Sequence, residues 1–123
     1  MDLSYHLIAA AAAADKTMEP TVVIDVGALI GITDYFVITA GRNDRQVRSI
    51  VDEVTFRVRE AGGGSVRRIE GLQAATWVLL DFGDFVVHVF DAEAREYFAL
   101  ERLWSDAPRI NWESEMSAEG AAT

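Results

Sequence analysis

The spacing of apolar residues in the first forty positions predicts one helix and two strands. Leu3–Ala14 has a helix-forming composition, with its apolar residues spaced to lie on one face. Thr21–Val26 is an apolar run typical of a buried strand, and Asp34–Ala40 is a second run rich in β-branched and aromatic residues. Gly27 and Gly31 bracket the connection between these strands, which we expect to be a loop.

A long amphipathic helix is predicted next. Asn43 suits the N-cap position, and Gln46 three residues later suits its capping partner. The residues spaced for the apolar stripe are Val47, Ile50, Val51, Val54, Val58 and Ala61. The three glycines at 62–64 are expected to end the helix, because glycine adopts the left-handed conformation at little cost.

The next residues predict a short strand, a loop and a β-hairpin. Ser65–Ile69 is the strand candidate, and Glu70–Ala74 is the loop. Thr76–Asp81 and Phe85–Phe90 alternate as hairpin strands do. Gly83 lies between them, where a tight turn requires a residue of positive φ.

A last helix is predicted from Glu93 to the helix-breaking Pro108, with Tyr97 on its apolar stripe. Residues 111–123 are acidic and rich in small residues, so we expect a disordered tail after a single domain over residues 1–110. Helices mix with strands and with one tight hairpin. The predicted fold class is therefore α/β: a single-domain sandwich in which helices pack on a mixed β-sheet.

Composition limits the classes of function. The 123 residues include no cysteine, which excludes disulfides, a thiol nucleophile and cysteine metal ligands. Twenty acids against eleven bases give a formal charge of −9, which disfavours binding to a phosphate backbone. The N-terminal apolar run is too short for a membrane span and lacks the basic flank of an export signal. We therefore expect a soluble protein with a protein partner and no membrane contact.

Two aspartates flank the hairpin turn and allow two interpretations. The tripeptide D-F-G at residues 81–83 matches the metal-binding motif of protein kinases, but the chain has one lysine and no glycine-rich phosphate loop. Asp81 and Asp84 could instead hold magnesium in a nucleotidyltransferase-like enzyme, which is the alternative function. Acids at a hairpin are more often turn-forming residues. A metal cluster at His88 is unsupported, since His6 is the only other histidine.

Trp77 shares its predicted strand face with Leu79 and Asp81. It is either a core residue or an exposed anchor of the kind that dominates interface hot spots. An apolar strand followed by acids suits a docking patch with an apolar centre and a polar rim. A separate cluster at the start of the long helix is either a solvated face or a contact for RNA phosphate: Arg42, Arg45 and Arg48.

Several segments together resemble the ribosomal silencing factor family, RsfS, also called the Iojap family. They are Ile32–Ile38, Gly41–Val47, Glu70-Gly71, Trp77–Asp84, Val87–Phe90 and Arg95–Trp104. The similarity covers about Leu3 to Ala107, and it is carried by the order and spacing of the segments.

The resemblance implies a compact α/β domain similar to nucleotidyltransferases but without catalysis. It implies binding to the large ribosomal subunit through its protein uL-fourteen, on the face that the small subunit must approach. A factor bound there blocks subunit joining and represses translation, especially in starvation. The resemblance further implies a bacterial cytoplasmic protein without cofactor or metal, whose contact with rRNA is minor.

The resemblance places the partner-binding surface on the hairpin, the loop before it and the last helix: Glu70, Gly71, Trp77, Leu79, Asp81, Asp84, His88 and Tyr97. No catalytic residue is predicted. Because exposed apolar strands also favour self-association, a homodimer through the same surface is left open.

Overall fold

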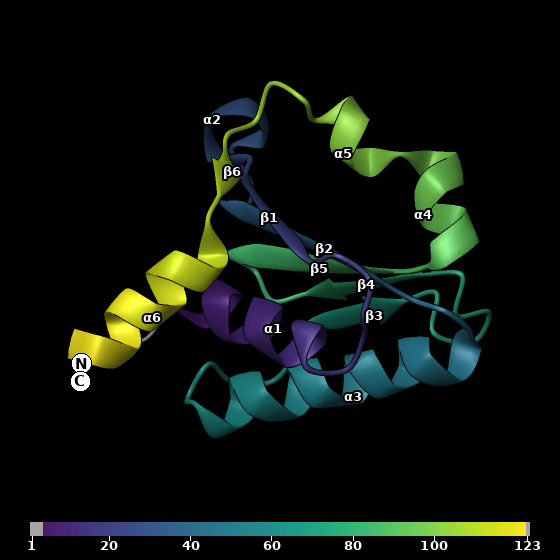
Figure 1. The fold of residues 1–123 in the computed structure, drawn as a ribbon, viewed down its shortest axis with the longest axis horizontal. Helices are drawn as coiled ribbons and strands as arrows, with labels where there is room; N and C mark the ends of the chain where they lie inside the picture. The colour runs from purple at the N-terminus through teal and green to yellow at the C-terminus, as the bar shows by residue number, and fades with distance from the viewer. Residues whose placement is uncertain (1–3, 123) are drawn as a thin grey trace.

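Six strands form one mixed sheet in the computed structural model of the chain, which describes residues 4–122 (Figure 1). The strands are β1 (Val22–Asp25), β2 (Tyr35–Gly41), β3 (Arg68–Glu70), β4 (Trp77–Asp81), β5 (Phe85–Asp91) and β6 (Arg109–Ile110). The helices are α1 (Tyr5–Ala14), α2 (Gly27–Ile30), α3 (Asp44–Glu60), α4 (Ala92–Phe98), α5 (Leu100–Leu103) and α6 (Trp112–Ala122). The strand order is β3-β4-β5-β2-β1-β6, with β2 and β5 parallel and the other neighbours antiparallel. The predicted α/β sandwich with a mixed sheet is confirmed.

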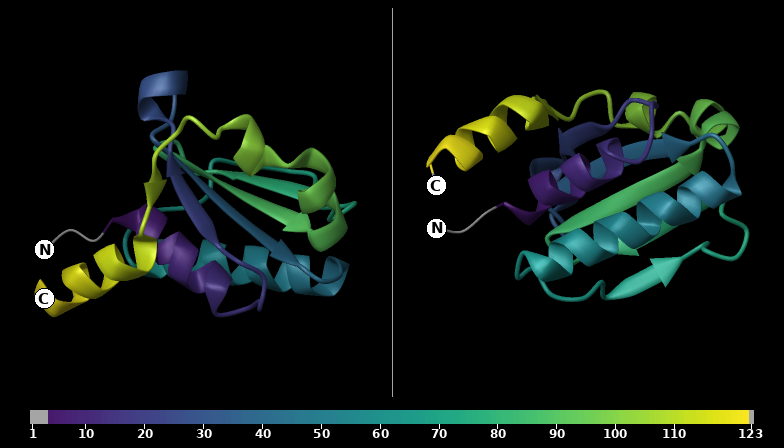
Figure 2. Two further views of the ribbon diagram at one scale, coloured as in Figure 1. Left: turned by 45° about the horizontal axis from the view of Figure 1, so that its top comes forward. Right: turned by 60° about the horizontal axis from the view of Figure 1, so that its bottom comes forward.

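Helices cover both faces of this sheet. α1 and α3 lie side by side against one face, while α4 and α5 lie over part of the other (Figure 1; Figure 2). The face under α1 and α3 buries an aliphatic cluster that includes Val37 and Val87. The face under α4 and α5 buries a second cluster, which is more aromatic and includes Phe36, Phe90 and Leu100. None of the helices within residues 4–122 is long and apolar enough to cross a bilayer.

The long helix α3 forms as its sequence predicts. The side chain of Asn43 accepts a hydrogen bond from the backbone N–H of Gln46 at 2.9 Å, so Asn43 is the N-cap. The buried stripe consists of Val47, Ile50, Val51, Val54 and Val58. Ala61 was expected on this stripe but is exposed, because the helix ends at Glu60 and Gly62 takes a φ of +98° just beyond it.

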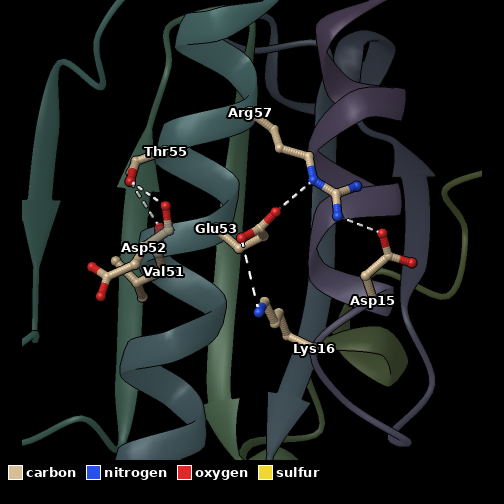
Figure 3. Close-up of polar contacts among 7 residues, drawn as sticks. All are labelled: Asp15, Lys16, Val51, Asp52, Glu53, Thr55 and Arg57. Atoms are coloured by element: carbon tan, nitrogen blue, oxygen red, sulfur yellow. Dashed lines mark hydrogen bonds and ion pairs between the residues drawn. The ribbon is translucent and has the colours of Figure 1, made fainter.

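Charged side chains join α3 to the end of α1 (Figure 3). The guanidinium of Arg57 donates to Glu53 at 2.6 Å and to Asp15 at 2.5 Å, and Lys16 lies 4.0 Å from Glu53. Burial alone lowers the pKa of Arg57, but its hydrogen bonds to the two carboxylates outweigh burial and raise it. The two helices are thus joined by a charge network at their solvent side as well as by the aliphatic core.

The predicted hairpin is also confirmed, since β4 and β5 pair antiparallel and Gly83 has a φ of +92°. The strand before it lies later than expected, at Arg68–Glu70 and not at Ser65–Ile69. Its position follows from its pairing, because Arg68 is the first residue to pair with β4, opposite Asp81.

Two connections differ from the sequence prediction. The expected loop between Gly27 and Gly31 contains the single helical turn α2. The expected last helix is broken in two at Ala99, which has a left-handed conformation with φ 48° and ψ 46°. This bend directs Leu100 into the aromatic cluster, so burial of Leu100 outweighs the helix-forming preference of alanine.

The expectation of disorder after residue 110 is wrong for Trp112–Ala122, which forms α6. The indole N–H of Trp112 donates to the carbonyl oxygen of Thr21 at 2.8 Å, and Trp112 and Met116 pack against the aliphatic cluster. Just before α6, β6 pairs with β1 at the sheet edge. The chain therefore remains ordered beyond the tail boundary expected at residue 111. The helix α6 lies beside α1 (Figure 2). Thr123 lies outside the described residues.

Candidate docking surface

The sheet face opposite α1 and α3 is open on its β3–β4 side, since α4 lies over β5 and β2. Cross-strand pairing places Glu70, Leu79 and His88 in one row on this face. Exposure falls along the row from Glu70, which is exposed, through half-buried Leu79 to His88, which is only 4% exposed. We call the open surface the docking face, and it consists of Glu70, Trp77, Leu79, Asp81, Tyr97 and Phe98.

Trp77 is held rigidly at the centre of an aromatic group. Its ring centroid lies 4.9 Å from that of Phe90 and 4.8 Å from that of Phe98. Its indole N–H donates to Nδ1 of His88 at 3.1 Å. Trp77 is half-buried: one part packs in the core, and the rest reaches the surface. Its role as a docking anchor stays a prediction.

His88 lies beneath the docking face and not on it. Burial lowers its pKa from 6.5 to about 4, so the imidazole is neutral at neutral pH. Because Nδ1 accepts the indole hydrogen bond, Nε2 carries the ring proton. Nε2 is buried and has no hydrogen-bond partner within the described part of the chain. A partner that docks on the surface would meet Trp77 and Leu79 before it met this histidine.

Gly71 supports the docking face from the turn before β4, where its backbone approaches that of Trp77. Its φ is +83°, and a Cβ added to it would lie 2.1 Å from the carbonyl oxygen of Trp77. Ala75, at the end of the same turn, also has a positive φ of 55°, and its N–H donates to the Gly71 carbonyl at 3.0 Å. Only a residue without a side chain fits at position 71, and the tight turn sets where Trp77 enters β4.

Asp81 and Asp84 lie at the hairpin turn, where their contacts are structural in the described residues. A carboxylate oxygen of Asp81 accepts from the Gly83 N–H at 2.8 Å, which is the turn-forming role of an aspartate. Asp81 also lies 4.0 Å from Arg68, which in turn lies 3.6 Å from Glu70. Asp84 is exposed at the tip of the hairpin. Residues 4–122 contain no group of three or more histidine, aspartate or glutamate side chains that could hold a metal ion.

The helix α4 extends the docking face with aromatic side chains. Phe98 packs on Trp77, and Tyr97, which is 84% exposed, meets Phe98 edge-on at a centroid distance of 5.2 Å. A shallow cavity of about 430 Å³ lies beside these rings, between Thr76 and Glu93. The aromatic surface that begins at Trp77 on β4 therefore continues onto α4.

Two residues near this surface were missed in the sequence. Phe98 follows Tyr97 directly, and the adjacent aromatic pair was the available signal. Thr33 is buried, and its hydroxyl donates to the carbonyl oxygen of Gly83 at 3.0 Å. The backbone N–H of Asp34 donates to the carbonyl oxygen of Asp84 at 2.8 Å. The segment before β2 thus holds the hairpin turn in place, a contact across fifty positions that no local pattern indicates.

The three arginines at the start of α3, Arg42, Arg45 and Arg48, differ in their contacts. Arg48 donates to the carbonyl oxygen of Gln73 at 2.8 Å and so ties α3 to the turn before β4. Arg42 and Arg45 are exposed, and their side chains make no ion pair with the residues that the structure describes. Contact of these two with RNA stays a prediction.

Comparison with known proteins places the chain in one family. The sequence profile described as "Ribosomal silencing factor during starvation" matches residues 3–123. The Ribosomal silencing factor RsfS of Bacillus subtilis is 45% identical over 101 residues, which cover 82% of this chain and 85% of that protein. A mouse protein named "Mitochondrial assembly of ribosomal large subunit protein 1" is 34% identical over 68% of this chain and 37% of its own length. A crystal structure of a protein from Chromobacterium violaceum superposes with a TM-score of 0.77 at 30% identity, covering 82% of this chain and 83% of that one.

Proposed function

The chain belongs to the ribosomal silencing factor family, and from this premise we propose that it represses translation by binding the large ribosomal subunit through the docking face. In this proposal the partner is the ribosomal protein uL-fourteen, and the bound factor occupies the surface that the small subunit must approach. The protein acts by occupancy and makes or breaks no covalent bond. It works in the bacterial cytoplasm without a cofactor.

The observation that carries the proposal is the open sheet face around Trp77 and Leu79. Both side chains are half-buried, and Phe98 of α4 packs on Trp77, while part of each side chain remains accessible at the surface. Fixed aromatic side chains lose little entropy on binding, and they are typical of interface centres. Glu70 and Asp81 border this apolar centre, as polar residues border most interfaces.

Charge supports a protein partner of opposite sign. The chain carries a formal charge of −9, and proteins embedded in rRNA are typically basic. Opposite charges accelerate association and disfavour other acidic proteins. Repulsion between this acidic chain and rRNA leaves the apolar docking face and its acids as the main source of affinity, with rRNA contact minor.

The experiment that tests this assignment is co-sedimentation of the purified protein with large subunits. Truncation of Trp77 is a poor probe, because Trp77 also packs on Phe90 and holds His88. Leu79→Ala combined with Tyr97→Ala removes two partly or fully exposed side chains and is expected to weaken binding about tenfold or more.

Phe56→Ala is the matched control, since Phe56 is 50% exposed on α3, on the opposite side of the sheet. Its binding should equal that of the unmodified protein. Circular dichroism and light scattering check that each variant keeps its fold and its state of assembly. A folded Leu79/Tyr97 variant that sediments with large subunits as tightly as the control shows that the docking face is wrongly assigned.

A further inference from the structure

A second cavity lies beside α4 and α5, and none of the docking-face residues lines it. It has a volume of about 690 Å³ and is bordered by α4, α5 and the segment leading into β6. It shares no lining residue with the shallow cavity beside Tyr97. Cavities of about 300–1,000 Å³ are typical of small-molecule sites.

Arginine side chains dominate the charge of this cavity. Three of the chain's eleven basic residues line it: Arg95, Arg102 and Arg109. Glu101 is neutralised by Arg95, which donates to its two oxygens at 2.9 and 3.2 Å. Arg102 and Arg109 are exposed and form no ion pair with any described residue, and Glu96 is the remaining acid of the lining. The balance is positive in a strongly acidic protein.

The walls of the cavity are held in place by the fold. The guanidinium of Arg95 is largely buried and also donates to the carbonyl oxygen of Pro20, so the first arginine is fixed. The left-handed conformation of Ala99 turns the chain between α4 and α5, which brings Arg95 and Arg102 to the same cavity. Trp104 lines the wall as a half-buried ring, packed at 85° against Phe36 with a centroid distance of 5.8 Å.

We propose that this cavity binds a phosphate-bearing nucleotide. Arg102 and Arg109 supply guanidinium groups, which bind phosphate oxygens in pairs and remain charged at all relevant pH values. Trp104 supplies an aromatic surface for the base, and base–aromatic contacts tolerate different bases. The nucleotide comes either from the free pool or from the single-stranded part of an RNA. This site is independent of the docking face and of the function proposed for it.

Calorimetric titration of the full chain tests the proposal at physiological salt, with ADP, adenosine and a short single-stranded oligoadenylate as probes. We expect saturable binding of ADP or of the oligonucleotide and none of adenosine, since adenosine lacks the phosphate. The double variant Arg102→Gln with Arg109→Gln should weaken that binding at least about tenfold, because it removes two charge-assisted contacts.

The control is Lys16→Gln with Arg59→Gln, which changes the net charge equally at two exposed basic residues, one just after α1 and one on α3. It should leave binding unchanged. Preference for ADP assigns the free pool, and preference for the oligonucleotide assigns RNA. The proposal is overturned if neither phosphorylated probe binds, if adenosine binds equally well, or if the control pair weakens binding as much as the cavity pair does.

Discussion

Acid should destabilise the protein through His88, the histidine buried beneath Trp77. Its pKa is lowered by burial from 6.5 to about 4 in the folded chain. Between these two values the unfolded chain binds a proton that the folded chain excludes, so stability falls as pH falls. Above pH 6.5 the titration of His88 does not lower the free energy of unfolding, and the free energy then falls as the pH drops toward 4. The total decrease in the free energy of unfolding is about 3 kcal/mol, and about 2 kcal/mol of it occurs between about pH 7 and about pH 5.

The measurement is urea unfolding at these two pH values, for the unmodified chain and for His88→Asn. The asparagine oxygen can still accept from the indole N–H of Trp77, but it does not titrate in this range. The variant is expected to be less stable at neutral pH because the smaller side chain leaves a cavity. Between the two pH values the variant should nevertheless lose about 2 kcal/mol less stability than the unmodified chain does. Carboxylates contribute equally to both proteins. Equal losses would refute the idea that His88 is buried in its neutral form.

Three further predictions concern residues that support the fold. Gly71→Ala should lower the free energy of unfolding by about 3 kcal/mol, because it combines a left-handed alanine with a Cβ at 2.1 Å from the Trp77 carbonyl oxygen. Gly31→Ala, at φ +81° with open space around the added Cβ, should lower it by about 1 kcal/mol. Equal losses of the two variants in thermal unfolding would contradict the steric argument. Trp112→Ala should cost about 2 kcal/mol in urea unfolding, whereas a disordered tail would give no change. Arg57→Met should lower the free energy of unfolding by less than about 1 kcal/mol, and this difference should shrink in high salt. A loss that does not depend on salt would indicate that packing, not charge, joins α1 to α3.

Local patterns predicted much of the fold, because they depend on neighbours in the chain. The stripe of α3 and its Asn43 cap follow from helical periodicity and from one short side chain. The β4–β5 hairpin follows from alternation and from the need for positive φ at Gly83. These features require no knowledge of distant residues.

Long-range contacts account for the parts that the sequence did not predict. α6 is anchored by a hydrogen bond from Trp112 to Thr21, which lies 91 positions earlier, and composition alone indicated disorder there. The break at Ala99 opposes the helix preference of alanine and depends on burial of Leu100.

The candidate site shows the same division. Alternation correctly placed Trp77, Leu79 and Asp81 on one strand face. It could not show that His88 is buried beneath that face, since burial depends on which strands α4 and α5 cover. Nor could it show that Gly71 acts through its close approach to another backbone.

The most direct test of the central claim measures subunit joining itself. Purified large subunits are incubated with increasing amounts of the protein, small subunits are then added, and the joined ribosomes are quantified on a sucrose gradient. We predict that the joined fraction falls as the large subunits become saturated, and that the Leu79→Ala, Tyr97→Ala double variant at the same concentration leaves joining intact. Large subunits saturated with the unmodified protein that still join small subunits normally would contradict the account.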